Sequence, residues 1–236
     1  MIRTLLKKIP FIILDQRQTR GFHLLNDIRF FSRKASIPIQ TIFDVGANVG
    51  QSIIEYKKYF PDSEIHAFEP IDETFKELQN NVQKFTNIYL NHFALSNKSE
   101  SKKIYLSESS LTNSLLNEVE TGQDKYNKTQ VIQTETLESY FVRNKLEKID
   151  LLKTDTEGFD VEVLKGAKHL LSNGYIKFIV TEVSFDPSNK AQTNFNSINE
   201  ILWNNNFVLS SFYDYNYKHS SLGTLHYCNA LYIFND

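Results

Sequence analysis

Two glycines follow an acidic residue in the segment Asp44-Val45-Gly46-Ala47-Asn48-Val49-Gly50. Gly46 and Gly50 allow the backbone to approach a ligand at points where a Cβ atom would collide with it. Their G-x-x-x-G spacing differs from the G-x-G-x-x-G of dinucleotide sites. The Asp44 carboxylate would repel a pyrophosphate, whereas it suits a ligand that carries an ammonium and a sulfonium group. The segment therefore indicates a site for the methyl donor S-adenosylmethionine, with a purely structural turn as the alternative.

A second acid, Glu69, ends a predicted strand about 20 residues after the glycines, at the distance where an acid can accept both ribose hydroxyls. An exposed strand-end glutamate before Pro70 is the structural alternative. The end of the third predicted strand, at residues 93–96, is placed by topology for adenine contacts. We therefore assign the donor site to Asp44, Gly46, Ala47, Asn48, Gly50, Glu69, Pro70 and Ala94.

Three more carboxylates lie at the ends of two later predicted strands. Asp155 and Glu157 follow one strand and Glu182 ends the next. Neighbouring carboxylates raise one another's pKa, which can produce a general base. They also suit a divalent cation, Asp155 could instead contact the donor's amino group, and Asp155 or Glu157 could cap the following helix. We rank Asp155 and Glu182 above Glu157 as catalytic residues.

No metal site is predicted. The sequence has no His-x-x-x-His or Cys-x-x-Cys spacing, and Cys228 is the only cysteine. A dedicated zinc site is therefore not expected, and nothing beyond the carboxylates themselves points to a divalent cation.

The elements that must position these residues alternate between short apolar strands and longer amphipathic helices, which is the pattern of a parallel sheet with crossover helices. The sequence predicts an α/β fold with a mostly parallel, seven-stranded sheet and helices on both faces. The predicted strands are 41–45, 64–68, 87–93, 149–153, 177–183, 207–212 and 230–234, with another extended piece at 102–106. The predicted helices are 49–60, 72–85, 137–144, 161–171 and 196–204. The polar segment 107–130 interrupts this rhythm and is predicted to be a loop, either a lid or a surface excursion.

Length and composition fit one main domain. The chain has 236 residues, 41% of them apolar, and a net charge of −2 without a basic stripe, so nucleic acid is not an expected partner. We expect a helical extension at residues 1–38, packed on a Rossmann-like domain at residues 39–236. The N-terminal apolar run is too short for a secretory signal or a membrane span. The single cysteine fits a reducing compartment, and we predict a cytoplasmic protein.

Three motifs together resemble the FkbM family of methyltransferases. They are residues 44–50, Phe68-Glu69-Pro70, and the segment 152–167, which reads LKTDTEGFDVEVLKGA. The resemblance spans about residues 41–182, and it implies a class I, Rossmann-like methyltransferase that acts on a hydroxyl of a sugar or another secondary metabolite. Thr154 and Thr156 stand where the family often has apolar residues, but these substitutions leave the acids in place. Acceptor specificity is expected to reside outside the resembling segment.

The sequence thus predicts an S-adenosylmethionine-dependent O-methyltransferase with a small-molecule or glycan acceptor, and it is compatible with a homo-oligomer. Two alternatives stay open. One is a nicotinamide-dependent oxidoreductase, against which Asp44 and the absence of a middle glycine argue. The other is a non-catalytic Rossmann-like binding protein, against which the acids at Asp44, Glu69, Asp155 and Glu182 argue.

Overall fold

A seven-stranded sheet forms the centre of the computed structural model, which describes residues 20–106, 128–186, 189, 192–218 and 223–235. The strand order is β3-β2-β1-β7-β8-β10-β9, and β10 runs antiparallel to both of its neighbours. This confirms the predicted α/β fold with a mostly parallel sheet. The strands are β1 (Thr41–Val45), β2 (Glu64–Phe68), β3 (Ile88–Asn91), β7 (Ile149–Thr154), β8 (Ile176–Val183), β9 (Phe207–Tyr217) and β10 (Leu225–Phe234).

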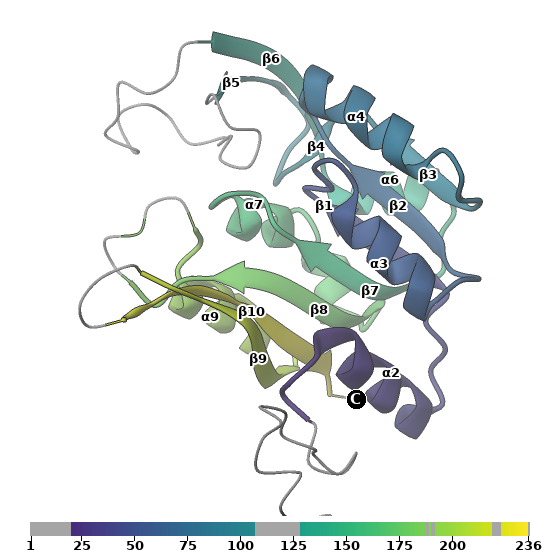
Figure 1. The fold of residues 1–236 in the computed structure, drawn as a ribbon, viewed down its shortest axis with the longest axis vertical. Coiled ribbons are helices and arrows are strands. Elements are labelled where there is room, and N and C mark those ends of the chain that lie inside the picture. The colour runs from purple at the N-terminus through teal and green to yellow at the C-terminus, as the bar shows by residue number, and fades with distance from the viewer. Residues whose placement is uncertain (1–19, 107–127, 187–188, 190–191, 219–222, 236) are drawn as a thin grey trace, which may run out of the picture.

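Helices cover both faces of this sheet (Figure 1). Alternate strand residues point to opposite faces, so Ile42 and Leu151 enter one core whereas Phe43 and Leu152 enter the other. The first face carries α2 (Leu24–Ala35), α3 (Gln51–Tyr59) and α4 (Asp72–Val82). The second carries α6 (Leu137–Arg143), α7 (Asp160–Lys165), α8 (Lys168–Ser172) and α9 (Phe195–Trp203).

A second, three-stranded sheet was not predicted. It has the order β4-β6-β5 and consists of β4 (Ala94–Leu95), β5 (Ser101–Leu106) and β6 (Lys128–Glu135). The predicted loop 107–130 therefore ends too late, because a strand begins at residue 128; its residues 107–127 lie outside the described part. The strand was missed because β6 has a single fully buried aliphatic residue, Ile132, with exposed Val131 beside it.

The predicted helix 161–171 is wrong as a single element, because the chain breaks at Gly166 between α7 and α8. A Cβ atom at Gly166 would lie 2.0 Å from the carbonyl oxygen of Ser96. The carbonyl of Gly166 also accepts a hydrogen bond from the amide of Glu138 in the first turn of α6, at 3.1 Å. Close backbone packing on both sides of this glycine therefore redirects the helix.

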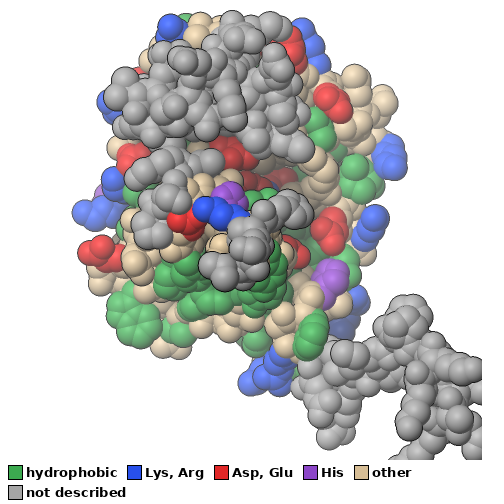
Figure 2. Space-filling view, turned by 60° about the vertical axis from the view of Figure 1, so that its left-hand side comes forward, with side chains coloured by type: hydrophobic (Ala, Val, Ile, Leu, Met, Phe, Trp, Pro, Cys, Tyr) green, Lys and Arg blue, Asp and Glu red, His purple; other side chains and the backbone are tan. Residues whose placement is uncertain are grey.

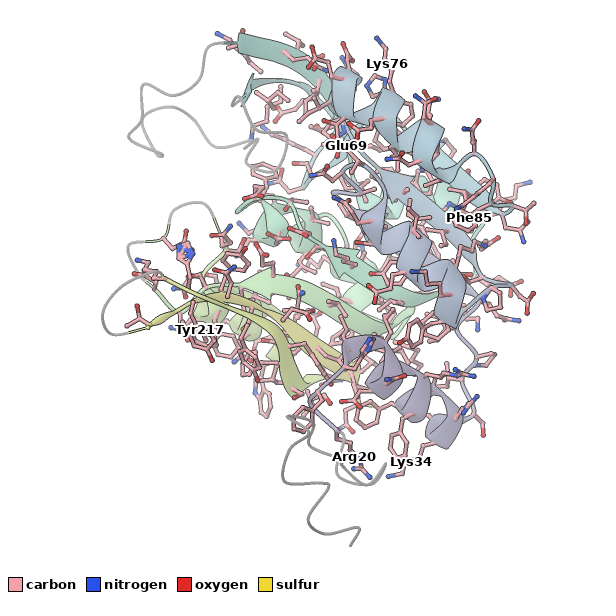
Figure 3. All side chains as sticks on the ribbon, viewed as in Figure 1. Arg20, Lys34, Glu69, Lys76, Phe85 and Tyr217 are labelled. Atoms are coloured by element: carbon pink, nitrogen blue, oxygen red, sulfur yellow. The ribbon has the colours of Figure 1, made fainter. Side chains whose placement is uncertain are left out.

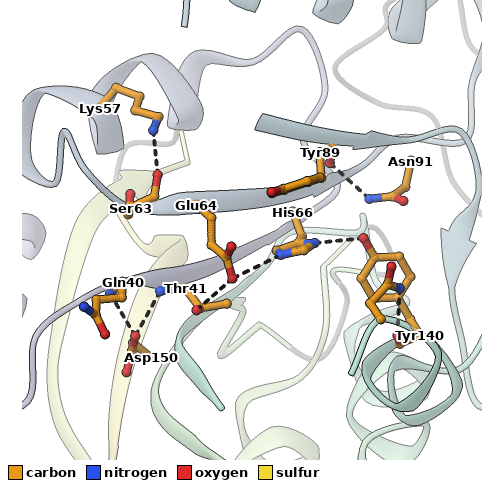
Figure 4. A network of polar contacts seen from close by, with 11 residues as sticks. Gln40, Thr41, Lys57, Ser63, Glu64, His66, Tyr89, Asn91, Tyr140 and Asp150 are labelled. Carbon is orange, nitrogen blue, oxygen red and sulfur yellow. Dashed lines mark hydrogen bonds and ion pairs between the residues drawn. The ribbon is translucent and has the colours of Figure 1, made fainter. Parts of the chain in front are cut away.

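A polar network ties the amino ends of β1, β2 and β7 together (Figure 4). The carboxylate of Asp150 accepts hydrogen bonds from the amides of Gln40 (2.8 Å) and Thr41 (2.9 Å). The buried His66 of β2 pairs through Nδ1 with the hydroxyl of Tyr140 on α6, at 2.8 Å. These contacts fix the strands relative to one another at one end, and so help to place the loops at the opposite, carboxyl end.

The N-terminal helix α2 packs on the main sheet through a buried hydrogen bond. The hydroxyl of Tyr213 on β9 donates to Oδ2 of Asp27 at 2.8 Å, and the amide of Gly21 donates to the same oxygen at 2.6 Å. Within the described ranges, the structure holds no helix with the length and apolar character that a membrane crossing needs.

Candidate active site

A cavity of about 460 Å³ opens at the carboxyl ends of β1, β2, β7 and β8. Open parallel sheets bind ligands at this edge, beyond the carboxyl ends of their strands. The structure brings most of the predicted site residues into its wall: Gly46, Ala47, Asn48, Glu69, Pro70, Ala94, Asp155, Glu157 and Glu182. Acidic side chains are visible in the recess in the middle of the face shown in Figure 2.

The glycine loop (residues 44–50) is held against two neighbouring strand ends. The amides of Gly46 and Ala47 both donate to the carbonyl of Phe68, at 3.0 Å each, and the amide of Asp155 donates to the carbonyl of Val45 at 3.0 Å. Gly46 has a φ of +79°, and a Cβ atom there would lie 1.9 Å from the carbonyl oxygen of Asp155. Glycine is therefore required at this position, because the loops after β1 and β7 touch through their backbones.

Glu69 joins the glycine loop to the segment after β2 and lies between that loop and the small sheet (Figure 3). Its Oε2 accepts a hydrogen bond from the amide of Asn48 at 3.1 Å, and its Oε1 accepts one from the amide of Ile71 at 2.9 Å. The side chain is 5% exposed, and burial raises its pKa to about 7 even though the two amides lower it. A carboxylate held in this way still offers lone pairs to the hydroxyls of a ligand.

Two of the predicted donor-site residues do not line the cavity. Asp44 is fully buried behind the glycine loop, and neither of its oxygens has a hydrogen-bond partner among the described residues. Burial raises its pKa to about 6, with Lys153 acting in the opposite direction. Gly50 instead permits helix packing, since a Cβ atom there would lie 2.9 Å from side-chain atoms of Leu78 and Val82 on α4.

Lys153, which sequence reasoning missed, is a cation in the described part of the cavity wall. Its Nζ lies 3.0 Å from Oδ2 of Asp155 and 3.6 Å from Oδ1 of Asp44. Burial alone would lower its pKa, but the two carboxylates outweigh burial and raise it. The β1–β7 register pairs Asp44 directly with Lys153, a relationship that depends on strand order. The only signal in the sequence was a lysine two residues before Asp155.

Glu157 and Glu182 face the cavity as acids that hold their protons near neutral pH. Burial, followed by the charges of Asp155 and Asp160, raises the pKa of Glu157 to about 8. Burial, followed by Asp155 and Glu157, also raises the pKa of Glu182 to about 8. Glu157 has a φ of +50° and accepts a hydrogen bond from Gln192 at 3.3 Å. Both groups can therefore gain or lose a proton in the pH range where a general base works.

The two ends of the cavity differ in chemistry. Tyr227 and Asn229 of β10 lie at the same end as Glu182, and the register pairs Asn229 directly with Glu182. The other end is apolar, and its wall includes Ile71, Ala94, Leu95 and Ile104. Sequence reasoning missed Tyr227, Asn229 and Ile104, because strand pairing and the small sheet bring them to the site from distant parts of the chain.

No trio of His, Cys, Asp or Glu side chains in the described ranges is arranged to hold a metal ion. Cys228, buried in β10, is a free thiol.

Similar solved structures include several methyltransferases. The precorrin-6y C5,15-methyltransferase of Geobacter metallireducens GS-15 is 12% identical, with a TM-score of 0.46 over 84% of this chain and 80% of that one. TrmK of M. capricolum, solved with S-adenosyl-homocysteine, is 14% identical, with a TM-score of 0.46 over 95% and 70%. Fibrillarin of Aeropyrum pernix, solved with natively bound S-adenosyl-L-methionine, is 12% identical, with a TM-score of 0.45 over 82% and 66%.

Among proteins with curated functions, none matches this chain. The family described as "Methyltransferase FkbM domain" matches residues 44–209, which is more than half of the chain and includes the glycine loop, Glu69 and all three candidate catalytic acids. The architecture is that of a class I methyltransferase, with a seven-stranded, mostly parallel sheet between two layers of helices. The chain therefore belongs to the FkbM methyltransferase family.

Proposed function

We propose that this protein transfers a methyl group from S-adenosylmethionine to a hydroxyl of a sugar, glycan or other small metabolite. The observation that carries the proposal is the composition of the cavity wall. The glycine loop, the buried Glu69 at the position expected to bind a ribose, and a cluster of carboxylates all lie in this wall. The resemblance of the motifs to the FkbM family supports the choice of a hydroxyl acceptor.

The residues present fit this donor. The cavity volume of about 460 Å³ is within the usual range for small-molecule sites. The apolar end suits an adenine, and Glu69 can accept hydrogen bonds from the ribose hydroxyls. Gly46, Ala47 and Asn48 line the cavity, so the glycine loop would lie against the donor. Asp44 and Asp155 supply negative charge for the donor's ammonium group, with Lys153 holding both in place.

The donor, when bound, supplies an electrophilic methyl group on a sulfonium. The chain's own contribution is to align the acceptor oxygen with that methyl group, which can lower the barrier by about 7–11 kcal/mol. An alcohol also has to lose its proton, and a positioned base adds about 10²–10⁴-fold. Alignment is thus the larger effect.

We assign the base to Glu182. Its pKa of about 8 is close to the operating pH, as an effective base requires. Asp155 is ion-paired with Lys153, which holds its side chain in place and suits it to orienting the donor. Tyr227 and Asn229 lie beside Glu182 and can hydrogen-bond the hydroxyls of an acceptor.

A nicotinamide-dependent oxidoreductase is the competing function. The described cavity wall carries the acids Glu69, Asp155, Glu157 and Glu182, and Lys153, its cation, is already ion-paired. Such a wall disfavours a pyrophosphate, because its described residues offer no cation outside an ion pair and because the paired Asp155 would repel the phosphate charges.

Calorimetry with S-adenosylmethionine and with NAD tests the donor. Binding of the first and no binding of the second is expected, and the opposite result would overturn the proposal. Radiolabelled donor with a panel of glycosides, oligosaccharides and hydroxylated metabolites then tests the acceptor, and label recovered on nitrogen or carbon would contradict O-methylation.

A further inference from the structure

Carboxyl groups outnumber cations around the cavity. Four carboxyls (Glu69, Asp155, Glu157 and Glu182) line it, and Asp44 lies directly behind the glycine loop. Lys153 is the cation in the described part of the wall, and its two ion pairs are with Asp44 and Asp155. Glu157 and Glu182 also line the described wall, as a pair of acids at the end where the reacting groups would meet.

The surroundings of this pair oppose two negative charges. Glu182 lies near the end of β8, and among the described residues it is faced by groups of β7, of the turn into α7 and of β10. The facing groups are Lys153 and Asp155 from β7 and its end, Glu157 and Asp160 from the turn into α7, and Tyr227, Cys228 and Asn229 from β10. Burial and the neighbouring acids keep the pKa of both Glu157 and Glu182 at about 8, so both are largely protonated at neutral pH in the donor-free protein.

We propose that Glu157 and Glu182 together release one proton when the positively charged donor binds, and that Glu182 takes up one proton from the acceptor hydroxyl during methyl transfer. The inference rests on the proposed function. A sulfonium brought next to the pair favours the carboxylate form, as any nearby opposite charge does. Glu182 is thus converted into a base only in the donor complex.

Bonds, charge and protons balance in the methyl-transfer step. The acceptor oxygen forms a bond to the methyl carbon as the bond between that carbon and sulfur breaks, and the electron pair stays on sulfur. The hydroxyl proton passes to Glu182. The sulfur loses its positive charge in the same step, so the pair returns to the protonation it had before the donor bound. One proton leaves the protein at donor binding, and none needs to leave at transfer.

Two ligands that differ by one methyl group and one positive charge provide the test. S-adenosylmethionine and S-adenosylhomocysteine share the ribose, adenine, ammonium and carboxylate, so any proton released through Glu69 or Asp44 is common to both. Calorimetry at pH 7 in buffers of different ionisation enthalpy counts the protons. We expect S-adenosylmethionine to release about one proton more than S-adenosylhomocysteine. Equal counts for the two ligands would overturn the proposal.

The affinities provide a second readout. Between pH 6 and 7.5 the Kd of S-adenosylmethionine is expected to fall by as much as about tenfold per pH unit relative to that of S-adenosylhomocysteine, the limit for one linked proton. In the double variant Glu157→Gln, Glu182→Gln this difference disappears, because the amides imitate the protonated acids and cannot release a proton. The control Glu162→Gln alters a glutamate that pairs with Lys165 away from the cavity, and it retains the wild-type behaviour.

The outcomes separate the two proposals. Failure of S-adenosylmethionine to bind at all would refute the proposed function. Binding without the extra proton would refute only the proton release. Should the double variant not fold, the comparison of the two ligands on the wild-type protein still decides the matter.

Discussion

Lys153 and Asp155 form an ion pair inside the candidate active site, with 3.0 Å between Nζ and Oδ2. The same ammonium lies 3.6 Å from Oδ1 of Asp44, so one lysine of β7 joins the residue that follows β7 to the end of β1. The contact links the residues proposed to orient the donor to the segment that carries the glycines. Removal of the lysine side chain would leave the carboxylates of Asp44 and Asp155 close together without their cation.

Lys153→Met is therefore expected to destabilise the protein. Breaking a buried ion pair typically costs about 3–5 kcal/mol, and we expect a value near the low end because Asp155 is 35% exposed. The free energy of unfolding in urea measures the loss. Lys148→Met is the matched control, since Lys148 is 41% exposed and its partner Asp150 keeps two backbone hydrogen bonds. Equal losses in the two variants would contradict a special role for Lys153.

Glu182→Ala should lower turnover more than it weakens the donor site. Loss of a base is expected to reduce kcat by about 10²–10⁴-fold, whereas alignment by the rest of the cavity leaves residual activity. The Kd of S-adenosylhomocysteine, which carries no sulfonium charge, reports on the donor site and is expected to change much less. Asp155→Ala is expected to weaken the binding of S-adenosylhomocysteine as well, because Asp155 is proposed to orient the donor's ammonium group. Unchanged turnover in both variants would remove these residues from the mechanism.

Gly46→Ala should abolish tight donor binding. The added Cβ atom would lie 1.9 Å from the carbonyl oxygen of Asp155, and the φ of +79° is itself unfavourable for alanine. The loops after β1 and β7 must then separate. Gly223→Ala is the control, because that glycine also has a positive φ but an added Cβ atom would have no heavy atom within 4 Å. Calorimetry with S-adenosylhomocysteine distinguishes them, and similar affinities would contradict the prediction.

Thermal stability should fall as the pH rises from 5 to 8. The pKa values of Glu157 and Glu182 are raised from 4.5 to about 8 in the folded protein. Between these values the folded state binds more protons than the unfolded state, so the free energy of unfolding decreases with pH. The Tm measured across this range is expected to decline less in the double variant Glu157→Gln, Glu182→Gln. Parallel Tm profiles for the two proteins would refute this linkage.

The sequence by itself determined the central sheet, the glycine loop and the acids. Short, mostly apolar runs such as 41–45 and 64–68 coincide with the observed strands, because strands buried between helix layers are rich in apolar residues. The site residues at strand ends could also be predicted, since parallel strands bring their carboxyl ends to one edge.

Only the tertiary structure decided how these residues are used. Asp44 pairs with Lys153 because β1 and β7 are neighbours in register, although more than one hundred residues separate them. Gly50 permits α4 to pack because side chains of that helix lie against its backbone. Gly166 interrupts a helix because the backbone of Ser96 lies against it. The local sequence shows which residues are apolar, flexible or charged. Contact between segments far apart in the chain depends on strand order and packing, and these decided which charges meet in the site.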